Sequence, residues 1–176
     1  MILSVIKAPD PVLSLPSKPV EKIDKKLRKL IRDMKETLLA ARDPQGVGLA
    51  APQVGVAQSF FIMRKNHGES DEMDIFINPK IIKKTTKENL RNENEPIEGC
   101  LSVDRIWSPI VRPNHIEVEY MDIHGKTHKK TFSGFEAIII QHEVDHLNGI
   151  LFTTLAMEQN VSLYEERGKK LYEIEL

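Results

Sequence analysis

Residues 133–149 read SGFEAIIIQHEVDHLNG, and this stretch decides the fold because it specifies a buried helix. Ser133 stands at the expected N-cap, and Glu136 three residues later would complete a capping box. The uninterrupted isoleucines at 138–140 predict a helix that is surrounded by other parts of the chain. We expect it to end at Asn148-Gly149, because glycine commonly follows the last helical turn.

The same helix carries two histidines four positions apart, His142 and His146, with Glu143 between them. Residues at that spacing differ by about 40° around a helix axis, so both imidazoles can face one metal ion. Glu143 lies about 100° from His142, where a carboxylate can act as a general base without binding the metal. Alternatively, two solvated histidines match the pattern by chance. The buried helix favours the metal site, because buried histidines need partners.

A catalytic metal usually has three protein ligands, so this helix leaves one to be found elsewhere. Residues 147–155 contain no Glu or His, and Glu158 lies beyond the break that ends the helix. Cys100 is the better candidate, because a thiolate is a strong soft ligand and Gly99 permits close backbone approach. A lone cysteine is more often a small buried apolar residue. Next to the histidine helix, we interpret it as a ligand.

The remaining pattern predicts an α+β fold in a single domain spanning residues 1–176. An amphipathic helix is expected at 21–42, and a second, polar helix at roughly 156–173. Strands are expected at 59–63, at 75–82 with an interruption at Asn78-Pro79, at 115–120 and at 127–132, the last two joined by a turn at 122–126. The polar stretches 65–74 and 88–96 are expected to be loops.

Composition narrows the class of protein further. The chain has 176 residues, of which 40% are hydrophobic and 29% charged, as in ordinary soluble proteins. Its net charge of −1 provides no overall attraction to nucleic acid or to an anionic membrane. A single cysteine excludes an intrachain disulfide, and residues 1–13 lack the apolar core of a signal peptide. We therefore expect a cytoplasmic protein that binds neither membranes nor specific nucleic-acid sequences. A bacterial source is favoured, and an organelle is the alternative.

The segment Gly46-Val47-Gly48-Leu49-Ala50-Ala51-Pro52-Gln53 loosely matches a dinucleotide-binding motif. We reject that interpretation because a helix, not a strand, precedes the glycines, and because Pro52 disfavours a long following helix. The segment predicts instead a turn whose backbone approaches a substrate and which presents the Gln53 amide to a developing oxyanion. A packed turn with Gln53 at the surface is the alternative.

Taken together and in this order, segments 46–53, 98–102 and 141–146 resemble the motifs of the peptide deformylase family. The resemblance also covers residues 9–13, 77–79 and 145–152, and therefore nearly the whole chain. It implies an α+β fold of mixed antiparallel sheets around the histidine helix. It implies hydrolysis of the N-formyl group from the N-terminal methionine of nascent peptides, with release of formate. It also implies one divalent metal ion, usually Fe(II), which Zn, Ni or Co can replace.

The resemblance assigns roles to residues of this chain. The metal ligands would be Cys100, His142 and His146. Glu143 would carry the proton from water to the leaving amine, while the Gln53 amide and the Leu101 N–H would stabilise the oxyanion. The residues expected to contact the substrate are Gly46, Val47, Gly48, Phe135, Ile138 and Ile139. Those expected to support the ligands are Glu98, Asp145 and Arg112, the last paired with Asp145.

Two other functions fit parts of the pattern. One is a metallopeptidase of the His-Glu-x-x-His type, against which the Cys100 segment and the missing downstream ligand argue. The other is a non-catalytic domain with a structural metal, which would need four protein ligands. The chain departs from the family at Ser14, Asp104, Trp107 and Thr154, so its preference beyond methionine is open. The resemblance also implies transient contact with the ribosome, although the mixed charges of the C-terminal segment do not identify a binding helix.

Overall fold

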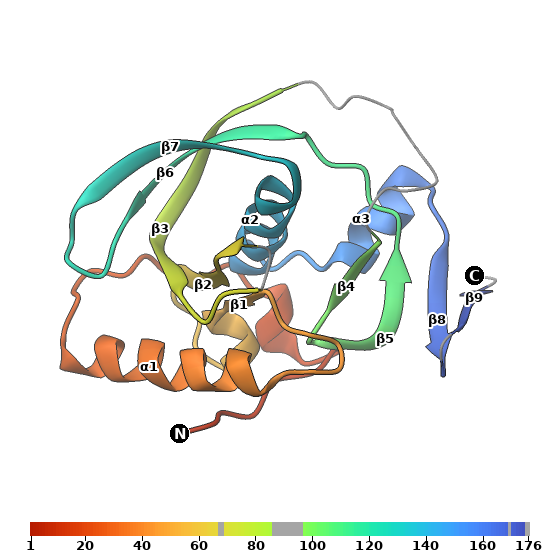
Figure 1. Ribbon diagram of the computed structural model, residues 1–176, viewed down its shortest axis with the longest axis horizontal. Helices are drawn as coiled ribbons and strands as arrows, with labels where there is room; N and C mark the ends of the chain where they lie inside the picture. The colour runs from red at the N-terminus through yellow and green to blue at the C-terminus, as the bar shows by residue number, and fades with distance from the viewer. Residues whose placement is uncertain (67–68, 86–96, 169, 175–176) are drawn as a thin grey trace.

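Two antiparallel sheets and three α-helices make up the described part of the chain (Figure 1). The computed structural model describes residues 1–66, 69–85, 97–168 and 170–174. In chain order the elements are the 3-10 helix η1 (Pro11–Ser14), α1 (Lys25–Ala40), β1 (Gly48–Ala50), the 3-10 helix η2 (Ala51–Val54), β2 (Phe60–Arg64), β3 (Met73–Lys84), β4 (Glu98–Cys100), β5 (Val103–Ser108), β6 (His115–Met121), β7 (Thr127–Ser133), α2 (Gly134–Leu147), α3 (Phe152–Gln159), β8 (Leu163–Arg167) and β9 (Lys170–Ile174).

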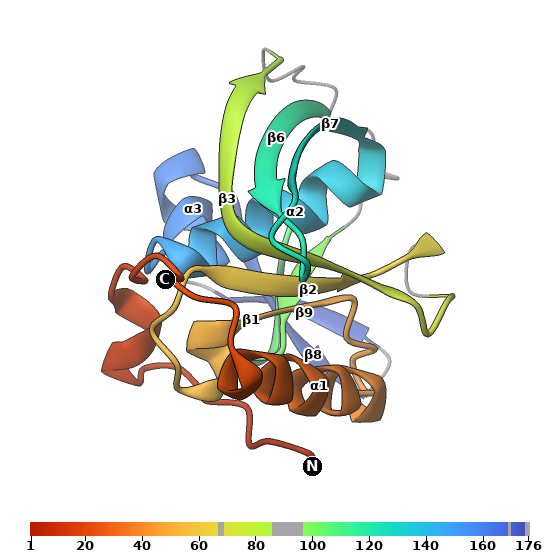
Figure 2. The same cartoon turned by 90° about the vertical axis from the view of Figure 1, so that its left-hand side faces the viewer.

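The two sheets lie on different sides of α2. The larger has the strand order β1-β2-β3-β6-β7, and the smaller has the order β4-β5-β8-β9. Figure 1 shows α2 in the middle of the molecule, with β3, β6 and β7 on one side and β4 on the other. Figure 2 shows the same molecule from its left-hand side, with β3, β6 and β7 in front. This arrangement confirms the predicted α+β fold of antiparallel sheets. No described helix is long and apolar enough to cross a membrane.

The first helix, α1, covers one side of the larger sheet with its apolar face. Its N-terminus is fixed by Asp24, whose side chain accepts a hydrogen bond from the Leu27 N–H at 2.9 Å. The helix therefore begins four residues later than the predicted 21–42, and it ends two residues earlier. Leu27, Ile31 and other apolar residues of α1 are buried in one cluster with residues of β1 and β2.

The second helix, α2, is buried as the isoleucine run predicted. Ile139 and Ile140 pack with Phe61 and Phe76 of the larger sheet. The predicted capping box is wrong, because the Ser133 side chain makes no capping bond. Ser133 is still the last residue of β7, where it pairs with His115. The helix ends at Leu147, followed by Asn148 and by Gly149 at a φ of +73°.

The C-terminal prediction of one polar helix at 156–173 is wrong. The helix α3 ends at Gln159, and Asn160 follows in the left-handed conformation. The chain then forms the hairpin of β8 and β9, which turns at Gly168 with a φ of +67°. Strand β8 pairs with β5, so this hairpin extends the sheet that contains β4. The structure therefore has the end of α3 and a β-hairpin where the sequence predicted one polar helix.

The predicted strands at 59–63, 115–120 and 127–132 correspond to β2, β6 and β7. Strand β3 is longer than the predicted 75–82, and it continues through Asn78-Pro79 by a shift in its register with β6. The last two residues of the predicted loop 65–74 therefore belong to β3. The predicted loop 88–96 lies outside the described residues. Strands β1, β4, β5, β8 and β9 were not predicted.

Candidate active site

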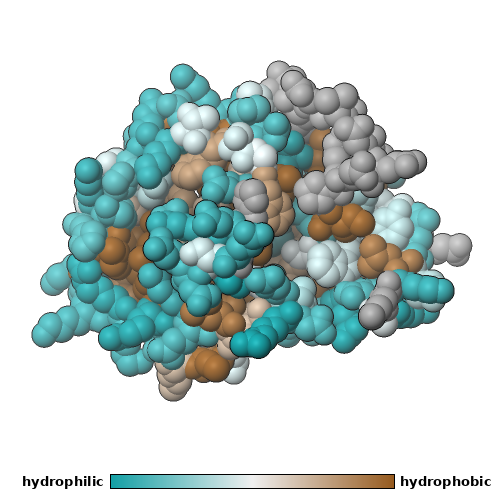
Figure 3. Space-filling model, viewed as in Figure 1, coloured by the Kyte–Doolittle hydropathy of each residue, from teal (hydrophilic) through white to brown (hydrophobic). Residues whose placement is uncertain are grey.

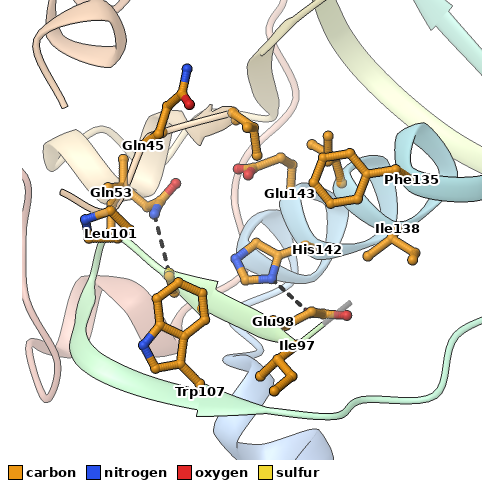
Figure 4. A pocket seen from close by; sticks show the side chains of 17 residues that line it. Gln45, Gln53, Ile97, Glu98, Leu101, Trp107, Phe135, Ile138, His142 and Glu143 are labelled. Atoms are coloured by element: carbon orange, nitrogen blue, oxygen red, sulfur yellow. Dashed lines mark hydrogen bonds and ion pairs between the residues drawn. The ribbon is translucent and has the colours of Figure 1, made fainter. Parts of the chain in front are cut away.

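A pocket opens between the beginning of α2, the segment that leads into β1, and strand β4 (Figure 4). Its lining brings together most of the residues singled out in the sequence, namely Gly46, Val47, Gly48, Gln53, Glu98, Cys100, Leu101, Phe135, Ile138, Ile139, His142 and Glu143. It also includes Pro44, Gln45, Ile97 and Gly99, which the sequence did not assign to a site. Trp107, a departure from the family in a region expected near the substrate, lines it as well. Segments far apart in the chain therefore meet at one concave surface.

Three candidate metal ligands converge beside this pocket, which Cys100 and His142 line and His146 does not. One ligand atom from each of Cys100, His142 and His146 lies within 4.8 Å of the others. The Cys100 Sγ and His146 Nε2 atoms are 3.1 Å apart. The two histidines lie one turn apart on α2, and Cys100 ends β4. A thiolate and two imidazoles at these positions can hold one metal ion and leave further coordination positions open.

The protonation of this cluster also suits a cation. Burial opposes a charge on Cys100, but the adjacent His146 and His142 hold the pKa of its thiol well below the usual value. Burial likewise disfavours a charged His142, yet Cys100 and Glu98 raise the pKa of its imidazole well above the usual value. The buried thiolate is therefore stabilised by a neighbouring positive charge. A metal ion can supply this charge while the His142 imidazole stays neutral.

A buried ion-pair network supports His142 through its Nδ1 atom. His142 Nδ1 is 3.0 Å from Glu98 Oε2, so its Nε2 atom is free to face the cluster. Arg112 binds both Glu98 and Asp145, and its Nη1 donates to Asp145 Oδ2 at 2.7 Å. Burial opposes ionisation of Glu98, but His142 and Arg112 lower its pKa. The network fixes both the orientation and the tautomer of the imidazole.

Glu143 lies beside the cluster and is almost fully buried. Its Oε2 atom has no hydrogen-bond partner among the described residues. Burial raises the pKa of this carboxyl to about 7, which suits a group that must both accept and return a proton near neutrality. The backbone of Gly48 lies so close that a Cβ there would stand 2.3 Å from Glu143 Oε1. Glycine at this position therefore makes room for the carboxylate.

Gln53 is buried, so the alternative of a surface glutamine is wrong. Its Oε1 atom accepts the Ala50 N–H at 2.8 Å, which fixes the direction of the amide. Its Nε2 atom lies 3.6 Å from Cys100 Sγ and 3.2 Å from Ser102 Oγ, and Figure 4 shows it facing the cluster. The amide nitrogen therefore faces Cys100 at the edge of the cluster.

Trp107 forms one wall of the pocket. Its ring covers Gly99 so closely that a Cβ there would lie 2.7 Å from it. Its indole Nε1 donates to Glu166 Oε2 of β8 at 3.0 Å. The contact depends on the pairing of Gly99 with Trp107 between β4 and β5, which local sequence patterns do not reveal. The C-terminal hairpin thus reaches the active site through one side chain.

Among the described residues, the other histidines do not line the pocket. His67 is outside the described residues. His115 and His124 are exposed. His128 is half-buried, and its Nε2 atom is 2.7 Å from Asp122 Oδ2.

A buried Cys-His-His cluster with an adjacent glutamate and open space on one side is the arrangement of metal-dependent hydrolases. The family model for polypeptide deformylase matches residues 2–161. The chain belongs to the polypeptide deformylase family, whose members are metal-dependent hydrolases that remove the N-formyl group from the N-terminal methionine of nascent polypeptides.

Individual relatives agree with this assignment. A peptide deformylase of Synechocystis sp. is 42% identical over 144 residues, which cover 81% of this chain and 73% of the relative. One from Dictyoglomus turgidum is 40% identical over 168 residues, covering 95% of this chain and all of the relative. The crystal structure of a peptide deformylase from Legionella pneumophila superposes with a TM-score of 0.78 at 36% identity, covering 88% of this chain and 86% of the other.

Proposed function

We propose that the pocket is the deformylation site and that Cys100, His142 and His146 hold its single divalent metal. The observation that carries the proposal is the convergence of these three ligand atoms within 4.8 Å beside the buried Glu143. The family resemblance supports Fe(II) as the physiological ion, and the mixed thiolate and imidazole set also accepts Zn, Ni or Co. A metal bound there supplies Lewis-acid activation of the formyl carbonyl and of water.

The residues around the cluster then have separate roles in hydrolysis. Glu143 removes a proton from the attacking water, whose oxygen bonds to the formyl carbon. The Gln53 Nε2 amide and the Leu101 backbone N–H donate hydrogen bonds to the formyl oxygen as it gains negative charge. When the carbon–nitrogen bond breaks, Glu143 delivers the proton to the peptide nitrogen. Formate and a peptide with a free amino terminus are the products.

The pocket wall provides a place for the methionine side chain. Val47, Phe135, Ile138 and Ile139 line it with apolar surface, which suits an unbranched thioether. Strand β1 lies at the edge of the larger sheet, so its outer side is available for pairing. We propose that the substrate backbone adds there as a further strand along the residues 46–48.

The Glu98, Arg112 and Asp145 network acts through His142 and does not touch the substrate in this proposal. Its buried ion pairs hold the imidazole so that Nε2 faces the metal. These three residues are positioning residues in that sense.

The decisive experiment compares Glu143→Ala with a control on the same helix, Glu136→Ala. After anaerobic purification, we expect Glu143→Ala to keep one metal ion per chain but to lose formate release from a formyl-Met peptide by at least about 100-fold. The control should retain both properties, because Glu136 does not line the pocket. Normal turnover by Glu143→Ala would overturn the assigned role. Equal activity on an unformylated peptide would favour the metallopeptidase alternative.

We further propose that residues 1–176 act as one domain in the bacterial cytoplasm, in transient contact with the ribosome. Deformylase relatives from Synechocystis sp. and Dictyoglomus turgidum support a bacterial setting. Action on nascent polypeptides requires access to the chain as it emerges. Fractionation of cell extract with ribosome pelleting tests this contact, and absence from every ribosomal fraction at low salt would contradict it.

A further inference from the structure

A strongly basic face on α1 lies outside the pocket and takes no part in the chemistry proposed above. Residues 22–32 contain six Lys or Arg against one Asp, although the whole chain has a net charge of −1. The rest of the chain is therefore net acidic. The six cations are all exposed, and they are Lys22, Lys25, Lys26, Arg28, Lys29 and Arg32.

Helix geometry keeps these charges together. Lys25, Arg28 and Arg32 follow the spacing i, i+3 and i+7, so they form a row about 10 Å long on one side. The opposite side is buried through Leu27 and Ile31. Figures 1 and 2 show α1 at the edge of the molecule, and Figure 3 shows a mainly hydrophilic surface over it.

Little of this charge is neutralised within the protein. Among the described residues, Lys29 pairs with Asp33 at 2.5 Å, while Lys25, Arg28 and Arg32 have no acidic partner. Two lysines on the larger sheet differ, because an acidic side chain lies within ion-pair distance of each. There Lys83 and Lys129 both pair with Glu117, at 3.5 and 3.4 Å. The α1 row is therefore a surface that would gain from an external polyanion.

We propose that the exposed face of α1 docks on the phosphate backbone of structured RNA, by charge and shape and without reading base sequence. A row of Lys and Arg neutralises successive phosphates and releases their counterions. An anionic membrane fits less well, because a membrane-surface helix inserts an apolar face and that face of α1 is buried. The choice of RNA rests on the proposed function, because nascent polypeptides emerge from an RNA-rich particle.

Because α1 leads into the pocket, RNA bound to this helix would lie close to the active site. The helix ends at Ala40, and the residues 44–48 that follow line the pocket. Lys25 and Ala40 are about 22 Å apart along the helix axis. Docking through α1 would therefore hold the pocket within a few tens of ångströms of the RNA surface. Emerging peptide termini would then be locally concentrated.

The test is a titration of the metal-loaded full chain into a fluorescently labelled RNA hairpin, followed by anisotropy over a salt series. One variant removes three unpaired cations from α1, namely Lys25→Gln, Arg28→Gln and Arg32→Gln. The matched control removes three exposed cations from the larger sheet, namely Lys80→Gln, Lys84→Gln and Lys130→Gln. Both variants lose the same net charge. Glutamine keeps helix propensity close to that of Lys and Arg, and circular dichroism checks that α1 is intact.

We expect the α1 variant to bind the hairpin at least tenfold more weakly at low salt. Its slope of log affinity against log salt should fall by about two to three, because each removed cation no longer neutralises a phosphate. The control should change affinity by less than about twofold. A second variant, Lys22→Gln with Lys26→Gln, should weaken binding in the same direction if the first one folds poorly.

Three results would overturn the inference. They are no hairpin binding by the unaltered protein at low salt, equally weakened binding in both triple variants, and equally tight α1-dependent binding to phosphatidylglycerol vesicles or polyglutamate. Hydrolysis of a free formyl-Met peptide serves as a separate readout, and it should be unchanged in the α1 variant. Failure of the unaltered protein to hydrolyse that peptide would instead contradict the proposed function, and the RNA titration would still decide this inference.

Discussion

Replacing Gly48 by alanine should displace the carboxylate of Glu143. The added Cβ would lie 2.3 Å from Oε1, 2.8 Å from Cδ and 3.0 Å from Cγ, whereas ordinary contacts are 3.4–4 Å. The carboxylate must therefore withdraw by about 1 Å, since Glu143 has almost no exposed surface through which to escape. A misplacement of about 1 Å can cost roughly 100-fold in rate, which corresponds to about 2.7 kcal/mol of activation free energy.

The assay for Gly48→Ala is formate release from a formyl-Met peptide, with kcat/KM compared at equal metal content. Metal binding should be unchanged, because the atoms nearest the new Cβ all belong to Glu143 and not to a metal ligand. A double-mutant cycle with Glu143→Ala provides the control. In the Glu143→Ala protein the carboxylate is gone, so the methyl group of Gly48→Ala should fit. Urea denaturation should then give a coupling free energy between the two substitutions of at least about 1 kcal/mol.

Two outcomes would refute this reasoning. One is a Gly48→Ala enzyme with normal kcat/KM. The other is an equal loss of stability from Gly48→Ala whether or not Glu143 is present, because the collision would then involve some other group.

Three further predictions concern stability and binding. Arg112→Met should lower the free energy of unfolding by about 3–5 kcal/mol and the Tm by about 10 °C, because Glu98 loses its buried partner. Asn78→Ala should cost about 1–3 kcal/mol, because the Asn78 amide makes hydrogen bonds of 2.8 and 2.9 Å to the backbone of Val20. Trp107 is the single tryptophan and lines the pocket, so titration with a Met-initiated product peptide should change its fluorescence.

Controls separate these effects from general damage. Arg32→Met changes an exposed arginine and should alter the Tm by no more than about 2 °C. If Arg112→Met had the free energy of unfolding of the unaltered protein, the buried carboxylates would need no cation. If Asn78→Ala did not change the free energy of unfolding, water would have to replace the hydrogen bonds of the amide. A peptide that binds without any change in Trp107 emission would contradict its place in the pocket wall.

The sequence predicted the part of the fold that local patterns control. The α2 helix was recognisable from its isoleucines, and it ends at Asn148-Gly149 as expected. The hairpin of β6 and β7 was recognisable from alternating residues around a turn with Gly125. In each case the signal and the structure lie within about 20 residues of sequence.

The C-terminal error shows where such patterns fail. Residues 163–174 contain charged residues at spacings that suit a polar helix, but β8 gains pairing with β5 about 58 residues earlier in the chain. A contact at that separation leaves no trace in local periodicity. Gly168 was the available signal, because its left-handed conformation makes the turn that a helix would forbid.

The site was predictable to the extent that its residue types carry chemistry. His142, His146 and Cys100 were named as ligands from their types and context, and the structure brings their ligand atoms together. The Trp107 wall could not be assigned in the same way. Its position depends on strand register and on a hydrogen bond to Glu166 in the unpredicted hairpin.

The joining of Cys100 to His146 has a consequence for folding as well as for chemistry. These two side chains are 46 residues apart in sequence, and they come from the smaller sheet and from the helix that packs on the larger one. A metal shared between them would act as a reversible cross-link that closes this loop. By loop-closure entropy, such a link would destabilise the unfolded chain by about 4 kcal/mol. Chelation would then lower the free energy of unfolding by a comparable amount, so the supply of the metal would set how well a newly made molecule resists unfolding.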